Sequence, residues 1–268
     1  MKHTLRSRVA PGLAAAAVVA ALVAAVPGVA AADSSTATTA GSTATTGGTT
    51  AGSSVTTVQP SNPFCTRALF GAAQQRVEAD LSNRVSQLNT LLASVNNTAN
   101  HLTTGDRQTL LNDVSTVELP GIQALVPQVQ QATTCPQLRS AARAMVFNYR
   151  VWVVMTPQTH FTVVADDETF IEGQFASFEP TIAEDIQNAQ ASGKDVTAAE
   201  ASFTDLKNQI AAAQSATSGQ DATLLAQTPQ GAPGNWSVFL AARSSLASAR
   251  NDLRAAYNDG LQIKADLQ

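Results

Sequence analysis

The chain has 268 residues, of which 44% are hydrophobic and only 5% aromatic, and its formal net charge is −4. A net-acidic chain with few basic clusters is a poor ligand for nucleic acid, so we expect no nucleic-acid partner.

Residues 1–32 are typical of a secretory signal peptide. The first eight positions hold three basic residues and no acid, an apolar stretch follows at 12–26, and small residues at 29–32 suit cleavage. The alternative is an uncleaved membrane anchor, but Pro27 and Gly28 end the apolar stretch too early. Cleavage leaves 13 basic and 20 acidic residues, a net charge of −7. We therefore expect a secreted protein, extracellular or associated with the cell wall, without stable membrane insertion.

Residues 33–63 are predicted to be a disordered linker. Positions 33–57 are almost entirely Ser, Thr, Gly and Ala, with Val55 as the only larger apolar residue. Such a segment cannot bury enough surface to fold. A flexible coil of this length spans roughly 30 Å, which suits a tether. Its many threonines also leave open an O-glycosylated stalk as the alternative to a bare spacer.

Cys65 and Cys135 are the only cysteines, and two cysteines in an exported chain predict a disulfide. Apolar spacing predicts two helices of similar length between them, over about 66–96 and 110–132. An antiparallel hairpin of these helices would bring the two cysteines together. Closing that loop would stabilise the fold by roughly 4 kcal/mol.

The rest of the chain also has helical signals. We expect the second helix to be interrupted at Pro120-Gly121 and kinked at Pro127. A third helix is expected over 136–155, followed by a new start at Thr156-Pro157. Capping boxes at Thr181–Glu184 and Thr197–Glu200 predict two further helix starts.

Residues 151–164 fit two structures. They are rich in β-branched residues around Thr156–Thr159, which would also make a β-hairpin. The helical periodicity of Leu138, Ala142, Met145 and Tyr149 before this segment and the acidic, Ala-containing stretch after it favour a helix.

The last thirty residues form a heptad seam. Residues at strict 3,4 spacing begin at Phe239 and end at Leu267, with small Ala residues alternating with larger ones. Its obvious partner is the preceding helix, whose seam carries Phe203, Leu206 and Ile210. We also expect the acidic stretch 151–193 to pair with Arg243, Arg250 and Arg254 on one edge of this last helix.

Residues 64–268 are therefore predicted to form an all-α domain, an elongated antiparallel helical bundle with coiled-coil character that is stapled by the disulfide. We expect a monomer, with self-association through the C-terminal heptad helix as the alternative.

The sequence offers one weak candidate for a polar or ligand-binding site, which consists of Tyr149, Arg150, His160, Asp166 and Asp167. A buried Arg150 would need a carboxylate partner such as Asp166 or Glu168. Imidazole and carboxylates can hold a cation, and a ligand pocket lined by Met145, Trp152 and Phe161 is the other possibility. An ordinary core is the stronger interpretation of both: no second imidazole is at hand for a cation site, and large apolar residues at helical spacing usually belong to the core. No motif for nucleophilic catalysis or phosphate binding is present, so we expect no enzyme, no cofactor and no metal.

Several short motifs resemble a group of exported, Ala-rich helical proteins of high-GC Gram-positive bacteria. They are Tyr149-Arg150-Val151-Trp152, Pro157-Gln158-x-His160, Ala165-Asp166 and, far downstream, Ala242-Arg243-x-x-Leu246-x-x-Ala249-Arg250-x-Asp252-Leu253. The resemblance implies export and helical structure, and it brings no functional residue with it. The chain departs from the pattern in the connection that contains Gly231-Ala-Pro-Gly234.

The sequence thus predicts a secreted, non-enzymatic helical protein that acts as a structural or interaction module at the cell envelope. Envelope proteins or cell-wall components would be its partners, and a helper of a cell-wall hydrolase is one such role. The alternative is an extracytoplasmic protein that binds a small apolar ligand or a cation near residues 149–167.

Overall fold

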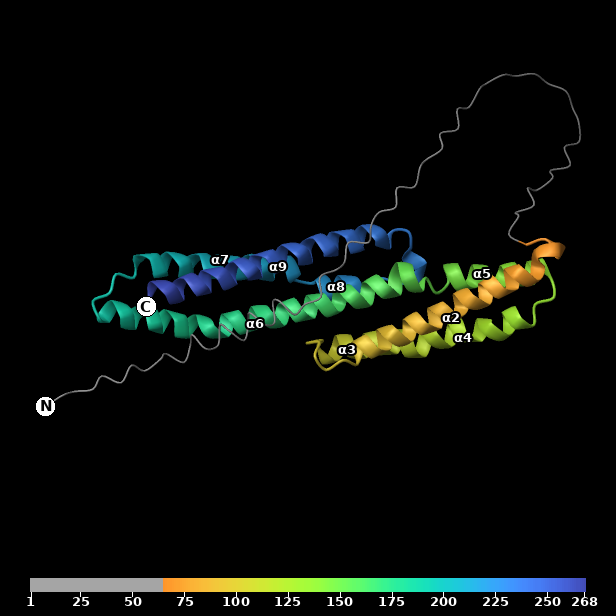
Figure 1. The fold of residues 1–268 in the computed structure, drawn as a ribbon, viewed down its shortest axis with the longest axis horizontal. Coiled ribbons are helices and arrows are strands. Elements are labelled where there is room, and N and C mark those ends of the chain that lie inside the picture. The colour runs from red at the N-terminus through yellow and green to blue at the C-terminus, as the bar shows by residue number, and fades with distance from the viewer. Residues whose placement is uncertain (1–64) are drawn as a thin grey trace, which may run out of the picture.

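The computed structural model describes residues 65–268, and the predicted signal peptide and linker (1–32 and 33–63) lie outside the described residues. The described part is helical and contains no strand, so the predicted all-α class is confirmed. Its helices lie nearly along one direction and give a long, thin bundle (Figure 1).

The helices of the N-terminal half are η1 (Arg67–Leu69), α2 (Phe70–Val95), α3 (Thr104–Asn112), η2 (Asp113–Glu118), α4 (Leu119–Gln130) and α5 (Cys135–Phe147). Those of the C-terminal half are η3 (Val151–Met155), α6 (Thr156–Ala191), α7 (Thr197–Thr217), α8 (Gln220–Leu225), η4 (Pro229–Gly231) and α9 (Asn235–Asp266). The segments η2 and η3 are π-helical, while η1 and η4 are 3₁₀ turns.

The N-terminal half packs α2 against α4 and α5 around a core of Leu and Val side chains, including Val77, Leu81 and Leu88 on α2. The predicted hairpin and disulfide are confirmed, since Cys65 and Cys135 are bonded with their Cα atoms 5.7 Å apart. The bond joins the segment just before η1 to the start of α5, and Figure 1 shows the starts of α2 and α5 at the same tip of the bundle.

The expected interruption at Pro120-Gly121 takes a different form. The helix does not break there; the π-helical segment η2 leads directly into α4, and Pro120 occupies the first turn of α4. Because the helix is continuous here, Pro120 leaves a carbonyl of the preceding turn without a helical N–H donor, and the irregular π-helical turn of η2 accommodates the proline.

The predicted helix over 136–155 is wrong in its second part. It ends at Phe147, and Arg150 adopts a left-handed backbone with φ 42° before η3 begins. The alternative of a β-hairpin at 151–164 is not found, because η3 and the first turns of α6 are helical throughout.

The predicted helix start at Thr181 is also wrong, because α6 continues through Pro180 to Ala191. Pro180 is exposed, and the buried side chains Phe175 and Ile186 keep the helical spacing across it. Packing on both sides of the proline outweighs the local signal for a cap. The start predicted at Thr197 is confirmed by α7.

The heptad helix is confirmed as α9, and its partner is α7, which lies antiparallel beside it (Figure 1). The buried seam consists of Phe239, Ala242, Leu246, Ala249, Leu253, Ala256 and Ile263. A Cβ atom at Gly260 would lie 3.7 Å from Leu206 of α7, which shows how closely the two helices approach. Among residues 65–268, no helix is both long and apolar enough to cross a membrane.

Candidate functional site

The structure separates the residues that the sequence grouped together. His160 is exposed near the start of α6, whereas Asp167 makes contact with a different histidine, His101, in the α2–α3 loop. Asp167 Oδ1 accepts the backbone N–H of His101 at 2.7 Å and lies 3.1 Å from its Nδ1. The His101 ring also stacks on Phe170, with the ring centroids 3.7 Å apart. The expected cluster of His160 with Asp166 and Asp167 is therefore wrong.

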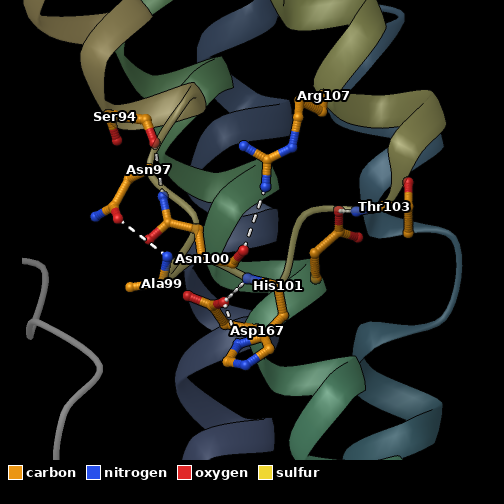
Figure 2. Close-up of polar contacts among 9 residues, drawn as sticks. Ser94, Asn97, Ala99, Asn100, His101, Thr103, Arg107 and Asp167 are labelled. Carbon is orange, nitrogen blue, oxygen red and sulfur yellow. Dashed lines mark hydrogen bonds and ion pairs between the residues drawn. The ribbon is translucent and has the colours of Figure 1, made fainter.

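Figure 2 shows that this histidine belongs to a loop held by its own polar groups. Asn100 donates to the Ser94 carbonyl at 2.8 Å, and the Arg107 guanidinium donates to the carbonyls of Val95 and Asn100. These bonds satisfy carbonyls at the end of α2 and fix the loop on α6. The His101–Asp167 contact therefore has a structural role, because it holds the α2–α3 loop against α6.

Asp166 lies in a cluster of acids. Its Oδ2 accepts the backbone N–H of Thr103 at 2.8 Å, and carboxylate oxygens of Asp106, Asp166 and Asp221 all lie within 4.8 Å of one another. Burial raises the pKa of Asp166 to about 7, and the negative charges of Asp106 and Asp221 add to the rise. Such a cluster can hold a divalent cation or share a proton.

Arg150 does not find the carboxylate that the sequence suggested. Its Nε–H donates to the Phe147 carbonyl at 3.2 Å, and its guanidinium lies over the Phe147 ring. A pocket lined by Met145, Trp152 and Phe161 is not formed either. Met145 and Phe161 are buried in the core, while Trp152 is 45% exposed and its ring carries the guanidinium of Arg84.

The predicted pairing of α9 with the acidic stretch holds at one position. Arg250 Nη2 lies 3.2 Å from Glu168 Oε1, an ion pair without a well-aligned hydrogen bond. Burial raises the pKa of Glu168, and the adjacent Arg250 offsets part of that rise. Arg243 and Arg254 make no ion pair with any described residue and line a groove of about 290 Å³ beside Phe161 and Val164.

Residues of the described part of the chain also enclose a cavity of about 600 Å³, here named the Glu118 cavity. It lies where α3, η2, the α5–η3 loop, the start of α6 and the segment after α8 meet. Its polar lining includes Thr109, Asp113, Glu118, Asn148, Gln158 and Thr228, and its apolar or aromatic lining includes Val117, Tyr149, Met155, Leu225 and Pro229. This volume is within the usual range of small-molecule sites.

Two irregular stretches of backbone build the walls of this cavity. Glu118 and Asp113 come from the π-helical η2, and Met155 comes from the π-helical η3. The left-handed Arg150 turns the chain between Tyr149 and η3. Short π-helical segments and strained residues are uncommon and concentrate at functional sites.

Glu118 is the unusual residue of the cavity. Its side chain is only 4% exposed, and its Oε2 accepts no hydrogen bond from any residue that the structure describes. Burial raises the pKa of Glu118 to about 7, and the nearby negative charge of Asp113 contributes to the rise. Burial also raises the pKa of Asp113.

Gln158 presents a second acceptor. Its Nε2 donates to the carbonyls of Leu224, Leu225 and Gln227 at 3.0–3.2 Å, at the end of α8. These contacts fix the orientation of the amide, which leaves Oε1 as an acceptor without a partner among the described residues.

Sequence reasoning missed Glu118, although a signal for it exists. Leu110, Val114, Glu118 and Ile122 follow one another every four residues, and all four are buried. A carboxylate on an apolar stripe must either leave the core or find a partner there. Of the five residues of the predicted polar cluster, only Tyr149 lines this cavity.

Comparison with protein-family models, with curated proteins and with solved structures found no match to this chain. The site must therefore be interpreted from its own chemistry.

Proposed function

We propose that this chain is an exported, non-enzymatic helical protein that binds a small molecule in the Glu118 cavity. The observation that carries the proposal is a cavity of about 600 Å³ lined by Glu118 and Gln158, two buried residues that each have an oxygen without a hydrogen-bond donor in the described protein. Buried acceptors are costly unless a donor reaches them, and a bound molecule supplies such a donor.

Export is part of the proposal. The signal-like residues 1–32 support it, and the Cys65–Cys135 disulfide fits an oxidising compartment. The disulfide staples the half of the bundle that holds η2, so a rigid scaffold supports one wall of the cavity.

Binding in the cavity can be tested by closing its mouth. Val117 lines the cavity and is 54% exposed, so Val117→Trp places a large ring there without disturbing the core. The control is Gln108→Trp, which adds the same ring at an exposed position outside the lining. A thermal-shift screen of the purified chain should use cationic, neutral and anionic small molecules of matched size.

A binder should raise the melting temperature of the wild type and of Gln108→Trp but not of Val117→Trp. If no compound stabilises the wild type, or if Val117→Trp responds like the wild type, the proposed function is wrong.

A structural or interaction module at the cell envelope is the second candidate. The observation that favours it is a group of exposed apolar side chains around the end of α5 and η3, namely Val146, Phe147, Trp152 and Val153, which are 42–52% exposed. Capture of envelope proteins by the wild type but not by Phe147→Ser/Trp152→Ser would support this role.

A further inference from the structure

The lining of the Glu118 cavity determines which class of molecule it can hold. Among its described lining residues, the ionisable groups are Asp113, Glu118 and Tyr149, and none is Lys, Arg or His. The charge that the cavity offers is therefore negative, and no cation of the described chain is paired with Glu118.

The unsatisfied groups are both acceptors. The Oε2 atom of Glu118 on η2 accepts no hydrogen bond from the described chain. The Nε2 of Gln158 donates to three backbone carbonyls, and its Oε1 has no hydrogen-bond partner in the described chain. Both oxygens are fully buried, so a molecule in the cavity reaches them only if these lining side chains turn toward it, and it must then bring hydrogen-bond donors. A protonated amine meets this requirement, because an ammonium group has three N–H donors and a positive charge.

The rest of the lining is apolar and aromatic. Val117, Met155, Leu225 and Pro229 line the cavity together with the ring of Tyr149. An aromatic ring attracts a nearby cation, and aliphatic side chains favour an apolar body over a second charge. A fully hydrated inorganic cation would leave this surface without a partner.

We infer that the Glu118 cavity binds a small primary amine in its protonated form, with the ammonium group at Glu118 and Gln158 and a short apolar or aromatic body against Tyr149 and Val117. This inference rests on the proposed function and specifies its ligand. It names the chemical class alone, and 2-phenylethylamine is a suitable probe of that class.

The test compares three probes of nearly equal shape by calorimetry on the purified full chain. They are 2-phenylethylamine, which is cationic at neutral pH, the neutral 2-phenylethanol, and the anionic 3-phenylpropionate. We expect measurable binding of the amine and at least about tenfold weaker binding of the other two, since each lacks the charge-assisted bond to Glu118.

Glu118→Gln removes the charge and keeps the shape of the side chain. It should weaken binding of the amine at least about tenfold and leave 2-phenylethanol unaffected. The matched control is Glu184→Gln, an exposed carboxylate on α6, which should bind the amine like the wild type. The melting temperature of Glu118→Gln should stay the same or rise, which would show that lost binding is not unfolding.

Binding should also depend on pH in one direction. The amine should bind more weakly at pH 5.5 than at pH 8, because burial and Asp113 raise the pKa of Glu118 to about 7 and its protonation removes the anion. The probe stays protonated over this range, so the change reports the cavity.

The outcomes separate this inference from the proposed function. If 2-phenylethanol or 3-phenylpropionate binds as tightly as the amine and Val117→Trp abolishes that binding, the cavity is a ligand site but the amine class is wrong. Tighter binding of K⁺ or Ca²⁺ than of the amine at the same cavity would also overturn it. If none of the probes or ions binds, both proposals fail.

Discussion

Two buried surfaces of this protein are made from opposite kinds of residue. The α7–α9 seam is closed by alanine and leucine, with Ala249, Leu253 and Ala256 at most 1% exposed. The polar stretch of α6 is defined by its buried residues Gln158, Thr159, Thr162, Asp166, Glu168 and Glu172. Both surfaces are helical and closely packed, so helix packing alone does not require the polar residues.

The two surfaces contribute differently to the stability of the fold. An apolar seam stabilises in proportion to the area that it buries, at about 25 cal/mol per Å². A buried polar group destabilises the folded state unless it is hydrogen-bonded there. In the polar stretch, Glu172 accepts a bond from Thr217 at 2.9 Å, but Thr159 and Thr162 make no side-chain hydrogen bond with the described chain. The Glu118 cavity lies beside the start of this stretch, at Gln158.

The largest effect is expected from a charge in the seam. Leu253→Asp places a carboxylate at a position that is 1% exposed, between α7 and α9, and should unfold the domain, with a loss of more than about 4 kcal/mol. Circular dichroism and chemical denaturation would measure it. Leu261→Asp is the control, since Leu261 lies on the same helix at 44% exposure and should change stability by about 0.5 kcal/mol or less.

Sedimentation sharpens the same prediction. A wild-type dimer that Leu253→Asp converts to a folded, fully helical monomer would show that the seam joins two chains, contrary to the packing of α9 on α7.

The polar stretch and the cavity should make stability depend on pH. Burial raises the pKa of Glu118 from 4.5 to about 7 and that of Asp166 from 3.8 to about 7. The folded chain therefore holds these protons more tightly than the unfolded chain does. Stability is greatest below the unfolded pKa values and falls as the pH rises through about 7, by up to about 3 kcal/mol for Glu118 and about 4 kcal/mol for Asp166.

Denaturation in urea at pH 5, 6, 7 and 8 would measure this slope. Glu118→Gln should make it shallower, whereas the exposed Glu184→Gln should not. A free energy of unfolding that is constant or that rises between pH 5 and 8 would contradict the assignment of buried, protonated acids.

Arg250 joins the two surfaces, because it lies on α9 and reaches Glu168 on α6. Arg250→Met leaves the Glu168 carboxylate without its cation and should raise the pKa of Glu168 further. We expect a loss of about 3 kcal/mol at pH 9 and a clearly smaller one at pH 6, where Glu168 can be protonated. The double variant Arg250→Met/Glu168→Gln should recover most of the stability, and no recovery would mean that Arg250 acts through packing alone.

The sequence predicted the apolar surface and not the polar one, for a physical reason. The heptad spacing from Phe239 onward predicts which residues of the last helix are buried. The cysteines at 65 and 135 predict that two distant segments of the chain lie close together. In the sequence, carboxylates and threonines such as Asp166 and Thr162 are equally consistent with a helix face that is exposed to solvent. Their burial depends on α8 and on the α2–α3 loop, whose positions follow from tertiary packing. The π-helical turns at η2 and η3, which shape the cavity, have no spacing signal of their own.

The smallest expected effect concerns the aromatic wall of the cavity. A Cβ atom at Gly121 of α4 would overlap the ring of Tyr149, so Gly121→Ala must displace that ring. Gly173→Ala on α6 is the matched control, because no atom lies within 4 Å of its added methyl group. The control should gain about 0.5–1 kcal/mol, since alanine is the better helix former. In Gly121→Ala the displaced ring should cancel that gain, which leaves stability within about 1 kcal/mol of the wild type. Chemical denaturation of both variants measures the difference.

Because Tyr149 lines the cavity, Gly121→Ala should also weaken binding of 2-phenylethylamine while Gly173→Ala does not. Equal stabilisation and equal binding in the two variants would show that Tyr149 does not rest on Gly121 and forms no wall of the site.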